Sequence, residues 1–343
     1  MREGYEGYDP DGVGVANGNF MGLPRVADAA VDVWGVAFAP TVSYGDGTAG
    51  GPANVLAASY QLDVCLPGLE RPWELGYDWY DVDAPQIAAQ TSLREGAARR
   101  IARLEAGQAL DGADRAAAAA LDEAGALLAI WLDGELAGSR ERGRLPVVVG
   151  GSHAVALGAY YGLPRDCAIL QIDAHMDLRV AYEGFRYSHA SVMHNALDER
   201  PDLRLVQVGI RDYSPGEARR ARDDDRVATF FDADLQRAAL RGEAFAKTCR
   251  PIVDALPGRV WVSLDIDGLY PALCAHTGTP VPGGLSVAQV RFLVEAVLAS
   301  GREIVGLDVV EVASAPHEYE GAVAARLAYE ISARAVLAQR GEE

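Results

Sequence analysis

The sequence predicts an α/β protein, a three-layer α/β/α sandwich with a central, mainly parallel sheet. Three short apolar runs, at residues 145–149, 168–172 and 260–264, have the length and the continuous hydrophobicity of strands buried in a parallel sheet. Stretches with a helical pattern separate such runs along the chain, as in proteins with alternating strands and helices. Half of the 343 residues are apolar, which is enough for one large core.

The N-terminal part begins with an extension, residues 1–25, that is rich in glycine and acidic residues and lacks the apolar core of a signal peptide. A strand is expected at 30–38, a glycine-rich loop at 43–51, and then a helix that follows Gly51-Pro52 and extends through Leu62. Residues 67–85 contain several tryptophans and tyrosines, and we expect an irregular aromatic segment there.

The remaining elements alternate regularly. Residues 86–134, rich in Ala, Leu, Arg and Glu and interrupted at 107–112, predict two helices. A long loop at 177–191 precedes a short helix at 192–197. Further strands are expected at 203–208, 228–231, 260–264 and 304–309. Since no repeat or linker is present, residues 26–343 are expected to form a single domain.

Three of the expected strands lead into histidine and aspartate residues. The sets are Gly150-Gly151-Ser152-His153, Asp173-Ala174-His175-Met176-Asp177 and Ser263-Leu264-Asp265-Ile266-Asp267. In open α/β sheets the ligand site lies beyond the carboxyl ends of the strands, so we expect the three sets to meet in one crevice. Two imidazoles and four carboxylates in one crevice indicate a metal site.

The number and type of these ligands favour two ions. Four carboxylates would repel one another unless cations neutralised them, and six ligands exceed what one catalytic ion needs with a position left open. A mixed carboxylate and imidazole set suits manganese(II), and iron, cobalt or nickel also fit. Two ions about 3.5–4 Å apart would bind and ionise a water between them. The expected chemistry is therefore hydrolytic.

Composition restricts the partners. The chain has 31 Lys plus Arg against 49 Asp plus Glu, and its net charge of −18 disfavours nucleic acid and favours small cationic substrates. No run of about 18 apolar residues predicts a membrane span. The four cysteines show neither metal spacing nor a disulfide pattern, so we expect a cytoplasmic protein.

These motifs resemble those of the ureohydrolases, the family of arginase, agmatinase, guanidinobutyrase and formiminoglutamase, which read GGDH, DAHxD and SxDxD. The resemblance runs from Ser43-Tyr44 to Ala324-Ala325-Arg326-Leu327 and covers most of the chain. It implies an arginase-like fold, a ureohydrolase-type catalytic domain and two Mn²⁺ ions per subunit, with Ni²⁺, Co²⁺ or Fe²⁺ as alternatives. The implied ligands are His153 and Asp177 for one ion, His175 and Asp267 for the other, and Asp173 and Asp265 as bridges.

The resemblance also implies catalytic roles. The stretch that ends in Glu311 resembles the last core strand of these enzymes, whose glutamate holds the guanidinium group. His189 lies in a stretch similar to one in agmatinases, and we expect it to titrate near neutrality and to pass protons. Asp177 would relay a proton to the departing nitrogen. The remaining histidines, His194, His276 and His317, are expected to be structural.

Several positions depart from the family pattern. Ser152 replaces the Asp of GGDH, Gly45 stands where agmatinases usually have Arg, and Tyr270 stands where an Asp usually precedes Pro271. Ala275 and His276 replace the usual pair in the glycine-rich turn that follows. None is an implied metal ligand, but residues that orient such ligands change metal affinity or activity by roughly 10–100-fold.

The implied reaction is hydrolysis of a guanidino C–N bond to urea and an amine, with agmatine as the expected substrate. The segment that follows Asp177 resembles agmatinases rather than arginases, which disfavours an α-amino acid. A Glu183 that faces the crevice would attract an ammonium tail, an inward Arg179 would attract a carboxylate tail, or the two side chains would pair with each other.

Several other substrates also fit these motifs. They include guanidinobutyrate, another guanidino acid, free guanidine or a formimino compound as substrate. A different class of function is an inactive paralogue that binds a guanidino metabolite. Because relatives form trimers or hexamers, a homo-oligomer is expected.

Overall fold

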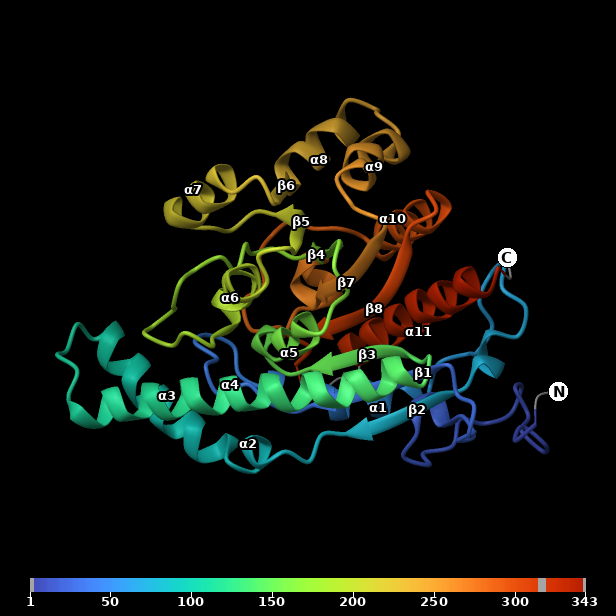
Figure 1. Ribbon diagram of the computed structural model, residues 1–343, viewed down its shortest axis with the longest axis horizontal. Helices are drawn as coiled ribbons and strands as arrows, with labels where there is room; N and C mark the ends of the chain where they lie inside the picture. The colour runs from blue at the N-terminus through green and yellow to red at the C-terminus, as the bar shows by residue number, and fades with distance from the viewer. Residues whose placement is uncertain (1–2, 314–318, 342–343) are drawn as a thin grey trace.

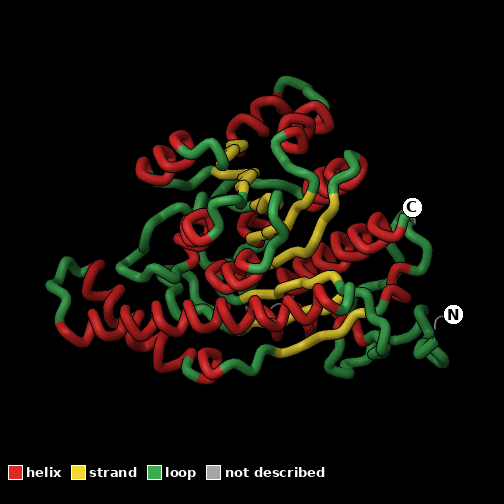
Figure 2. The backbone as a smooth tube through the Cα atoms, viewed as in Figure 1, coloured by secondary structure: helices red, strands yellow, loops and turns green. Residues whose placement is uncertain are grey.

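The computed structural model of the protein describes residues 3–313 and 319–341, so His317 lies outside the described residues. Eight strands form one sheet in the order β2-β1-β3-β8-β7-β4-β5-β6, and every neighbouring pair is parallel (Figures 1 and 2). The strands are β1 Val31–Val36, β2 Tyr77–Asp81, β3 Leu145–Gly150, β4 Cys167–Ile172, β5 Arg204–Ile210, β6 Val227–Phe231, β7 Arg259–Asp265 and β8 Glu303–Val310. The predicted α/β class is confirmed.

Helices cover both faces of the sheet (Figure 1). One face packs against α1, α8, α9, α10 and α11, and the other against α2, α4, α5, α6 and α7, while α3 packs on α4. The α-helices of the described residues are α1 Gly51–Ser59, α2 Pro85–Ala88, α3 Gln90–Glu105, α4 Gly112–Glu141, α5 Leu157–Tyr161, α6 Val192–Glu199, α7 Pro215–Asp223, α8 Asp232–Leu240, α9 Phe245–Asp254, α10 Val287–Ala299 and α11 Tyr319–Arg340. In this part of the chain, no helix has both the length and the hydrophobicity needed to cross a bilayer.

The helix α4 shows how local chemistry sets the ends of an element. Its N-cap, Asp111, accepts the N–H groups of Ala113 and Asp114, and the Asp114 side chain accepts the N–H of Asp111 in return. The expected end at residue 134 is wrong, since the helix continues to Glu141. The apolar face does not stop there, because Leu132 and Leu136 are both buried.

The segment expected to be irregular, residues 67–85, contains the edge strand β2, so that prediction is wrong in part. Tyr77 and Trp79 point into the core, and the intervening Asp78 lies on the other face, where it pairs with Arg144. This alternation has the period of a strand, and the strand pairs in parallel with β1. Aromatic residues that seemed to break the pattern therefore form the buried side of the strand.

The N-terminal extension covers this edge of the sheet. The side chain of Asn19 donates to the carbonyl of Tyr77 at 2.7 Å and accepts the N–H of Trp79 at 2.7 Å. It thereby satisfies backbone groups that an edge strand would otherwise leave open. Phe20 and Leu23 are buried beside it. The division into an extension and one domain stays a prediction.

The strand order sets where the expected site residues meet. The strands β3, β8, β7 and β4 are adjacent at the centre of the sheet, and all four run in the same direction. Their carboxyl ends lead into His153, Glu311, Asp265 and Asp173, respectively. Residues far apart in the sequence thus converge at one edge of the sheet.

Candidate metal centre

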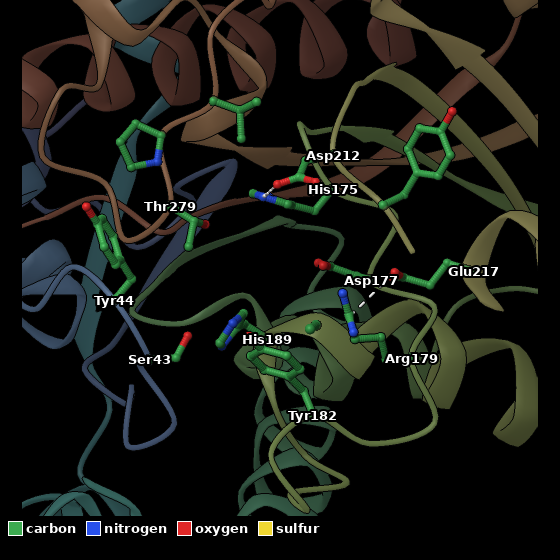
Figure 3. Close-up of a pocket in the computed structure, with 14 residues that line it drawn as sticks. Ser43, Tyr44, His175, Asp177, Arg179, Tyr182, His189, Asp212, Glu217 and Thr279 are labelled. Atoms are coloured by element: carbon green, nitrogen blue, oxygen red, sulfur yellow. Dashed lines mark ion pairs between the residues drawn. The ribbon is translucent and has the colours of Figure 1, made fainter. Parts of the chain in front are cut away.

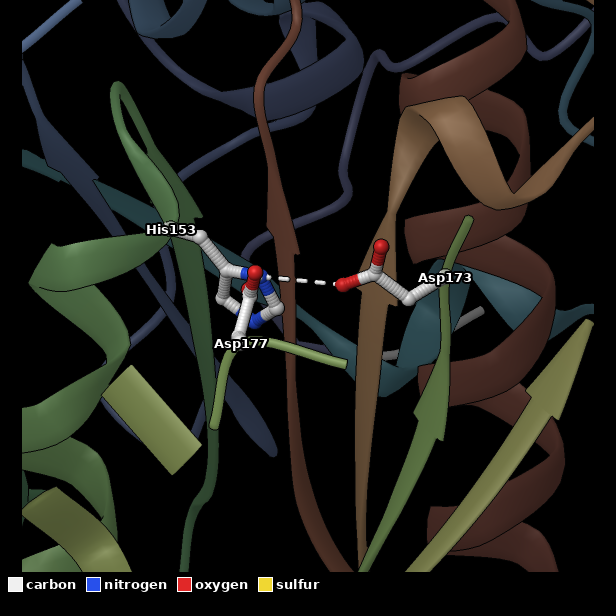
Figure 4. A group of neighbouring side chains, drawn as sticks. All are labelled: His153, Asp173 and Asp177. Atoms are coloured by element: carbon white, nitrogen blue, oxygen red, sulfur yellow. Dashed lines mark ion pairs between the residues drawn. The ribbon is translucent and has the colours of Figure 1, made fainter. Parts of the chain in front are cut away.

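His153 is the centre of a first group of ligands. It follows β3 and begins a 3₁₀ turn, which places its imidazole at the end of the sheet. Its Nδ1 atom lies 2.9 Å from Asp177 Oδ2, 3.2 Å from Asp173 Oδ2 and 3.4 Å from Asp265 Oδ2. Figure 4 shows the imidazole of His153 facing the carboxylates of Asp173 and Asp177.

A second group surrounds His175. Its Nδ1 atom lies 3.1 Å from Asp267 Oδ2 and 3.6 Å from Asp173 Oδ1. Asp173 therefore takes part in both groups, with one oxygen toward each histidine. The structure brings together all six ligands expected from the sequence.

Two observations show that these residues fit metal ions. The buried Nδ1 of His153 makes no hydrogen bond to any described residue, although three carboxylates surround it. Burial and the charge of Asp173 raise the pKa of Asp177 to about 7, and burial and the charge of Asp267 raise the pKa of Asp265. Divalent cations would remove this repulsion, and a set of imidazole nitrogens and carboxylate oxygens suits manganese(II).

Asp177 holds an uncommon backbone conformation, with φ at 54°. Its carbonyl oxygen accepts the N–H groups of Met193 and His194 at the start of α6, both at 3.1 Å. The left-handed conformation lets the backbone cap this helix while the carboxylate faces His153.

Glu311 lies at the end of β8, and the structure fixes it tightly. One carboxylate oxygen, Oε1, accepts the N–H of His153 at 2.7 Å. Its own N–H donates to the Gly151 carbonyl, and its carbonyl accepts the hydroxyl of Thr277. Burial raises the pKa of Glu311 to about 7. The carboxylate thus lies beside the first group of ligands, and hydrogen bonds to the backbone and to the side chain fix the residue.

A pocket of about 290 Å³ opens onto the two groups (Figure 3). Two of the ligands, His175 and Asp177, contribute to its wall. The other lining residues are Ser43, Tyr44, Arg179, Tyr182, His189, Ala190, Asp212, Tyr213, Glu217, Thr279, Pro280 and Val281. Asp212 and Glu217 were missed in the sequence. Asp212 could have been found because it follows β5, the strand next to β4, and Glu217 because it forms a capping box with Ser214.

His189 lines the pocket and packs edge-on against the ring of Tyr182, with 5.8 Å between the ring centroids. Burial and the positive charge of His175 and His153 lower the pKa of His189 to about 4. This shift runs against the expected titration near neutrality, and the proton-passing role of His189 stays a prediction.

Arg179 and Glu183 do not pair with each other. Arg179 lines the pocket, where its Nε lies 3.5 Å from Glu217 Oε2 and its guanidinium lies 4.9 Å from the centre of the Tyr182 ring (Figure 3). Glu183 lies away from the pocket, toward α3, where Arg94 and Arg100 are its basic neighbours. A spacing of four residues brings side chains together on a helix, but this segment is a loop.

The site loop, residues 178–189, packs against the α3–α4 pair (Figure 1). Phe185 is buried in a small cluster with Ile101 and Leu121 of these helices. The carboxylate of Asp122 accepts the N–H groups of residues 186 and 187, and Arg100 donates to the carbonyl of residue 183. Elements that contribute no ligand therefore position the wall that carries Arg179 and His189.

Comparison with known proteins agrees with this geometry. Residues 29–337 match the sequence profile of the arginase family. The chain belongs to the arginase family. It is 38% identical over 190 residues to the N(1)-aminopropylagmatine ureohydrolase of Thermus thermophilus, a match that covers 54% of this chain and 61% of that protein. The match thus spans less than two thirds of that relative.

Two further proteins resemble this arginase-family chain over more of its length. The agmatinase of Bacillus anthracis is 27% identical over 296 residues, which cover 84% of this chain and 86% of that protein. The crystal structure of the agmatine ureohydrolase of Thermoplasma volcanium superposes with a TM-score of 0.69 at 24% identity, covering 91% of this chain and 92% of that one. At this identity the superposition shows a shared fold.

The structure explains two of the departures from the pattern of the arginase family. Ser152 caps the turn that carries His153, because its hydroxyl accepts the N–H of Ala154, a task that Asp also performs. At Gly45, a Cβ atom would lie 2.9 Å from the carbonyl oxygen of Gly278, so the chain has no room for an arginine there.

The other departures lie in the turn after β7. Tyr270 provides no side-chain cap to the turn that it precedes. His276 is half-exposed, and its Nδ1 lies 3.0 Å from Glu320, which ties the turn to α11. Nothing in the structure explains why Tyr stands at 270.

If Asp173 and Asp265 bridge two ions, replacing either by Asn removes a bridging negative charge. We expect Asp173→Asn and Asp265→Asn each to bind one metal ion or fewer per chain, as measured by elemental analysis. The buried Asp114, which caps α4 far from the site, provides the control, and Asp114→Asn should keep both ions. Two full equivalents of metal in Asp173→Asn or Asp265→Asn would contradict the bridging roles.

Proposed function

We propose that this chain hydrolyses the C–N bond of a guanidino compound and releases urea and an amine. The observation that carries the proposal is the pair of His/Asp groups that share Asp173, beside the buried carboxylate of Glu311. Two divalent ions bound there, proposed to be Mn²⁺, would supply a hydroxide nucleophile at neutral pH. Ni²⁺, Co²⁺ or Fe²⁺ would suit the same ligands.

The chain's own residues would orient the substrate and move protons. Glu311 can accept two N–H groups of a planar guanidinium, which would hold the central carbon in place. Asp177 would pass a proton to the departing nitrogen, since its carboxylate lies in the first group of ligands and also lines the pocket. His189, which lines the pocket, would accept a proton there and release it to solvent.

Agmatine is the proposed substrate. The agmatinase of B. anthracis resembles this chain over most of its length, and the T. thermophilus relative is named for an agmatine that carries an aminopropyl group. The pocket supports a cationic tail, because the charge of Arg179 is partly compensated by Glu217, and the carboxylate of Asp212 is 67% exposed at the wall. An ammonium group would bind favourably there.

A guanidino acid is the second candidate. Arg179 lines the pocket with 39% of its side chain exposed, so its guanidinium can receive a carboxylate tail. Agmatine and a guanidino acid of similar length differ in the charge of the tail, and the choice between them depends on whether Asp212 or Arg179 contacts that tail.

A urea-release assay with manganese or nickel added separately tests the proposal. Agmatine, aminopropylagmatine, arginine, 4-guanidinobutyrate, guanidinoacetate and guanidine form the panel, with Asp173→Asn as the control for contaminating activity. We expect agmatine or its aminopropyl form to give the highest kcat/KM. Arginine as the best substrate would contradict the assignment of the loop, and no urea from any compound would favour a formimino substrate or a metabolite-binding paralogue.

If Glu311 holds the guanidinium, Glu311→Gln replaces a charge-assisted contact by a neutral one. We expect a loss of about 1.5–3 kcal/mol in apparent transition-state binding, seen as a lower kcat/KM with unchanged metal content. Gln retains an oxygen that can accept the N–H of His153. The control is Glu330→Gln, a buried carboxylate on α11 that pairs with Arg291 away from the site. Kinetics of Glu311→Gln that match the wild type would remove Glu311 from the reaction.

We further propose a cytoplasmic homo-oligomer, either a trimer or a hexamer. Two exposed apolar side chains on α4, Leu127 and Ile130, support subunit contacts, being 47% and 64% exposed. All four cysteines are free thiols, as expected in a reducing compartment. Light scattering should give a mass several times 36.4 kDa, and a monomer at working concentration would contradict the assembly.

A further inference from the structure

One row of the central sheet is polar although it lies in the interior. The residues of this polar row occupy matched positions on five adjacent strands: Thr229 on β6, Gln207 on β5, Gln171 on β4, Ser263 on β7 and Asp308 on β8. All except the half-buried Thr229 have no exposed surface. A polar group in such a place costs free energy unless it is hydrogen-bonded.

The polar row lies directly beneath the metal centre. Because side chains alternate along a strand, Asp173 and Asp265 project from the same face as Gln171 and Ser263, two residues further along. This face packs against α4, α5 and α6. The row is thus the last layer of the sheet before the ligands begin.

Hydrogen bonds run along one half of the row in a single direction. The hydroxyl of Thr229 donates to Gln207 Oε1 at 2.9 Å, and Gln207 Nε2 donates to Gln171 Oε1 at 2.7 Å. Gln171 Nε2 then donates to Asp173 Oδ2 at 2.8 Å. Aligned donors of this kind strengthen one another in a medium of low dielectric constant.

The orientation of both amides is fixed by their surroundings. Gln171 Nε2 also donates to the carbonyl of His175, and Gln207 Nε2 also donates to the carbonyl of Met176. A flipped Gln171 would place its oxygen against a carboxylate and a carbonyl, neither of which can donate. The donor end of the chain therefore always faces Asp173.

This donor determines how Asp173 presents its lone pairs. Oδ1 accepts the N–H of His175 at 2.6 Å, and Oδ2 accepts the amide of Gln171. Each oxygen of a carboxylate has two lone pairs, so one remains free on each. The free lone pair on Oδ2 is available to an ion in the His153 group, and the free lone pair on Oδ1 is available to an ion in the His175 group.

The other half of the row acts on His153. Its Nε2 lies 3.0 Å from Ser263 Oγ, which donates to Asp308 Oδ1 at 2.9 Å. Tyr160 and Trp261 donate to the other oxygen of Asp308. With Nε2 donating to the serine, Nδ1 keeps its lone pair for an ion.

We propose that Gln171 is the positioning residue that makes Asp173 a bridging ligand, and that Gln207 and Thr229 act through Gln171. This inference rests on the proposed binuclear centre. It concerns metal binding, so it can be tested without the reaction.

The experiment titrates Mn²⁺ into the metal-free full-length protein, and electron paramagnetic resonance reports free, isolated and paired ions. Gln171→Leu removes the donor at similar volume, and we expect binding of one ion to weaken by about 10–100-fold, with loss of the paired signal. Gln207→Leu should have a smaller effect in the same direction. Because Gln207 acts through Gln171, the double variant should match Gln171→Leu alone.

Melting temperatures, measured in parallel, separate positioning from stability. Ser332→Ala is the control, since this buried hydroxyl on α11 lies away from the candidate ligands and donates to the carbonyls of Ala328 and Tyr329 in its own helix. A Gln171→Leu variant with a lower melting temperature but wild-type affinity for two ions would overturn the proposal. So would a double variant whose loss of metal affinity equals the sum of the losses in Gln171→Leu and Gln207→Leu. If the wild-type chain binds two ions but releases no urea, the proposed function is contradicted. The metal titration still tests the role of Gln171, because it does not depend on the reaction.

Discussion

The site depends on one electrostatic constraint, the convergence of four aspartates in a space that water barely reaches. Asp173, Asp177, Asp265 and Asp267 are each at most 4% exposed. Two histidines cannot balance four ionised carboxylates, so this arrangement favours the binding of divalent cations. Because β4 and β7 are adjacent and parallel, the aspartates at their carboxyl ends lie side by side. The two histidines lie within this concentration of negative charge.

Different parts of the fold hold the two sides of the site. The candidate ligands follow the ends of the sheet strands. Buried hydrogen bonds hold two of them, since Gln171 bonds to Asp173 and Ser263 to His153. The pocket wall instead belongs to loops, of which the longest is held from outside by α3 and α4. The candidate metal ligands thus follow the sheet strands, whereas the pocket wall that would contact the tail of the proposed substrate is formed by loops.

The central strands and the convergence of the six candidate ligands could be predicted from the sequence, because continuous apolar runs and strand-end polar residues both reflect a buried parallel sheet. Prediction failed at β2, where an edge strand alternates aromatic and acidic residues. It also failed at Glu183, since the path of a long loop does not follow from spacing. The polar row was not recognised because register between strands separated by up to 137 positions, such as Gln171 and Asp308, is a property of the folded chain.

Because the site loop packs on the α3–α4 pair, the shape of the pocket wall and the candidate ion ligands depend on different residues. Substitutions at Asp122 or Phe185 would alter the shape of the pocket wall without touching an ion ligand. Under the proposed function, substrate preference could therefore change through substitutions that support the pocket wall from α3 and α4, while the candidate metal ligands stay constant. If the proposed function holds, proteins with this architecture could accept new guanidino substrates through changes at a support distant from the ions.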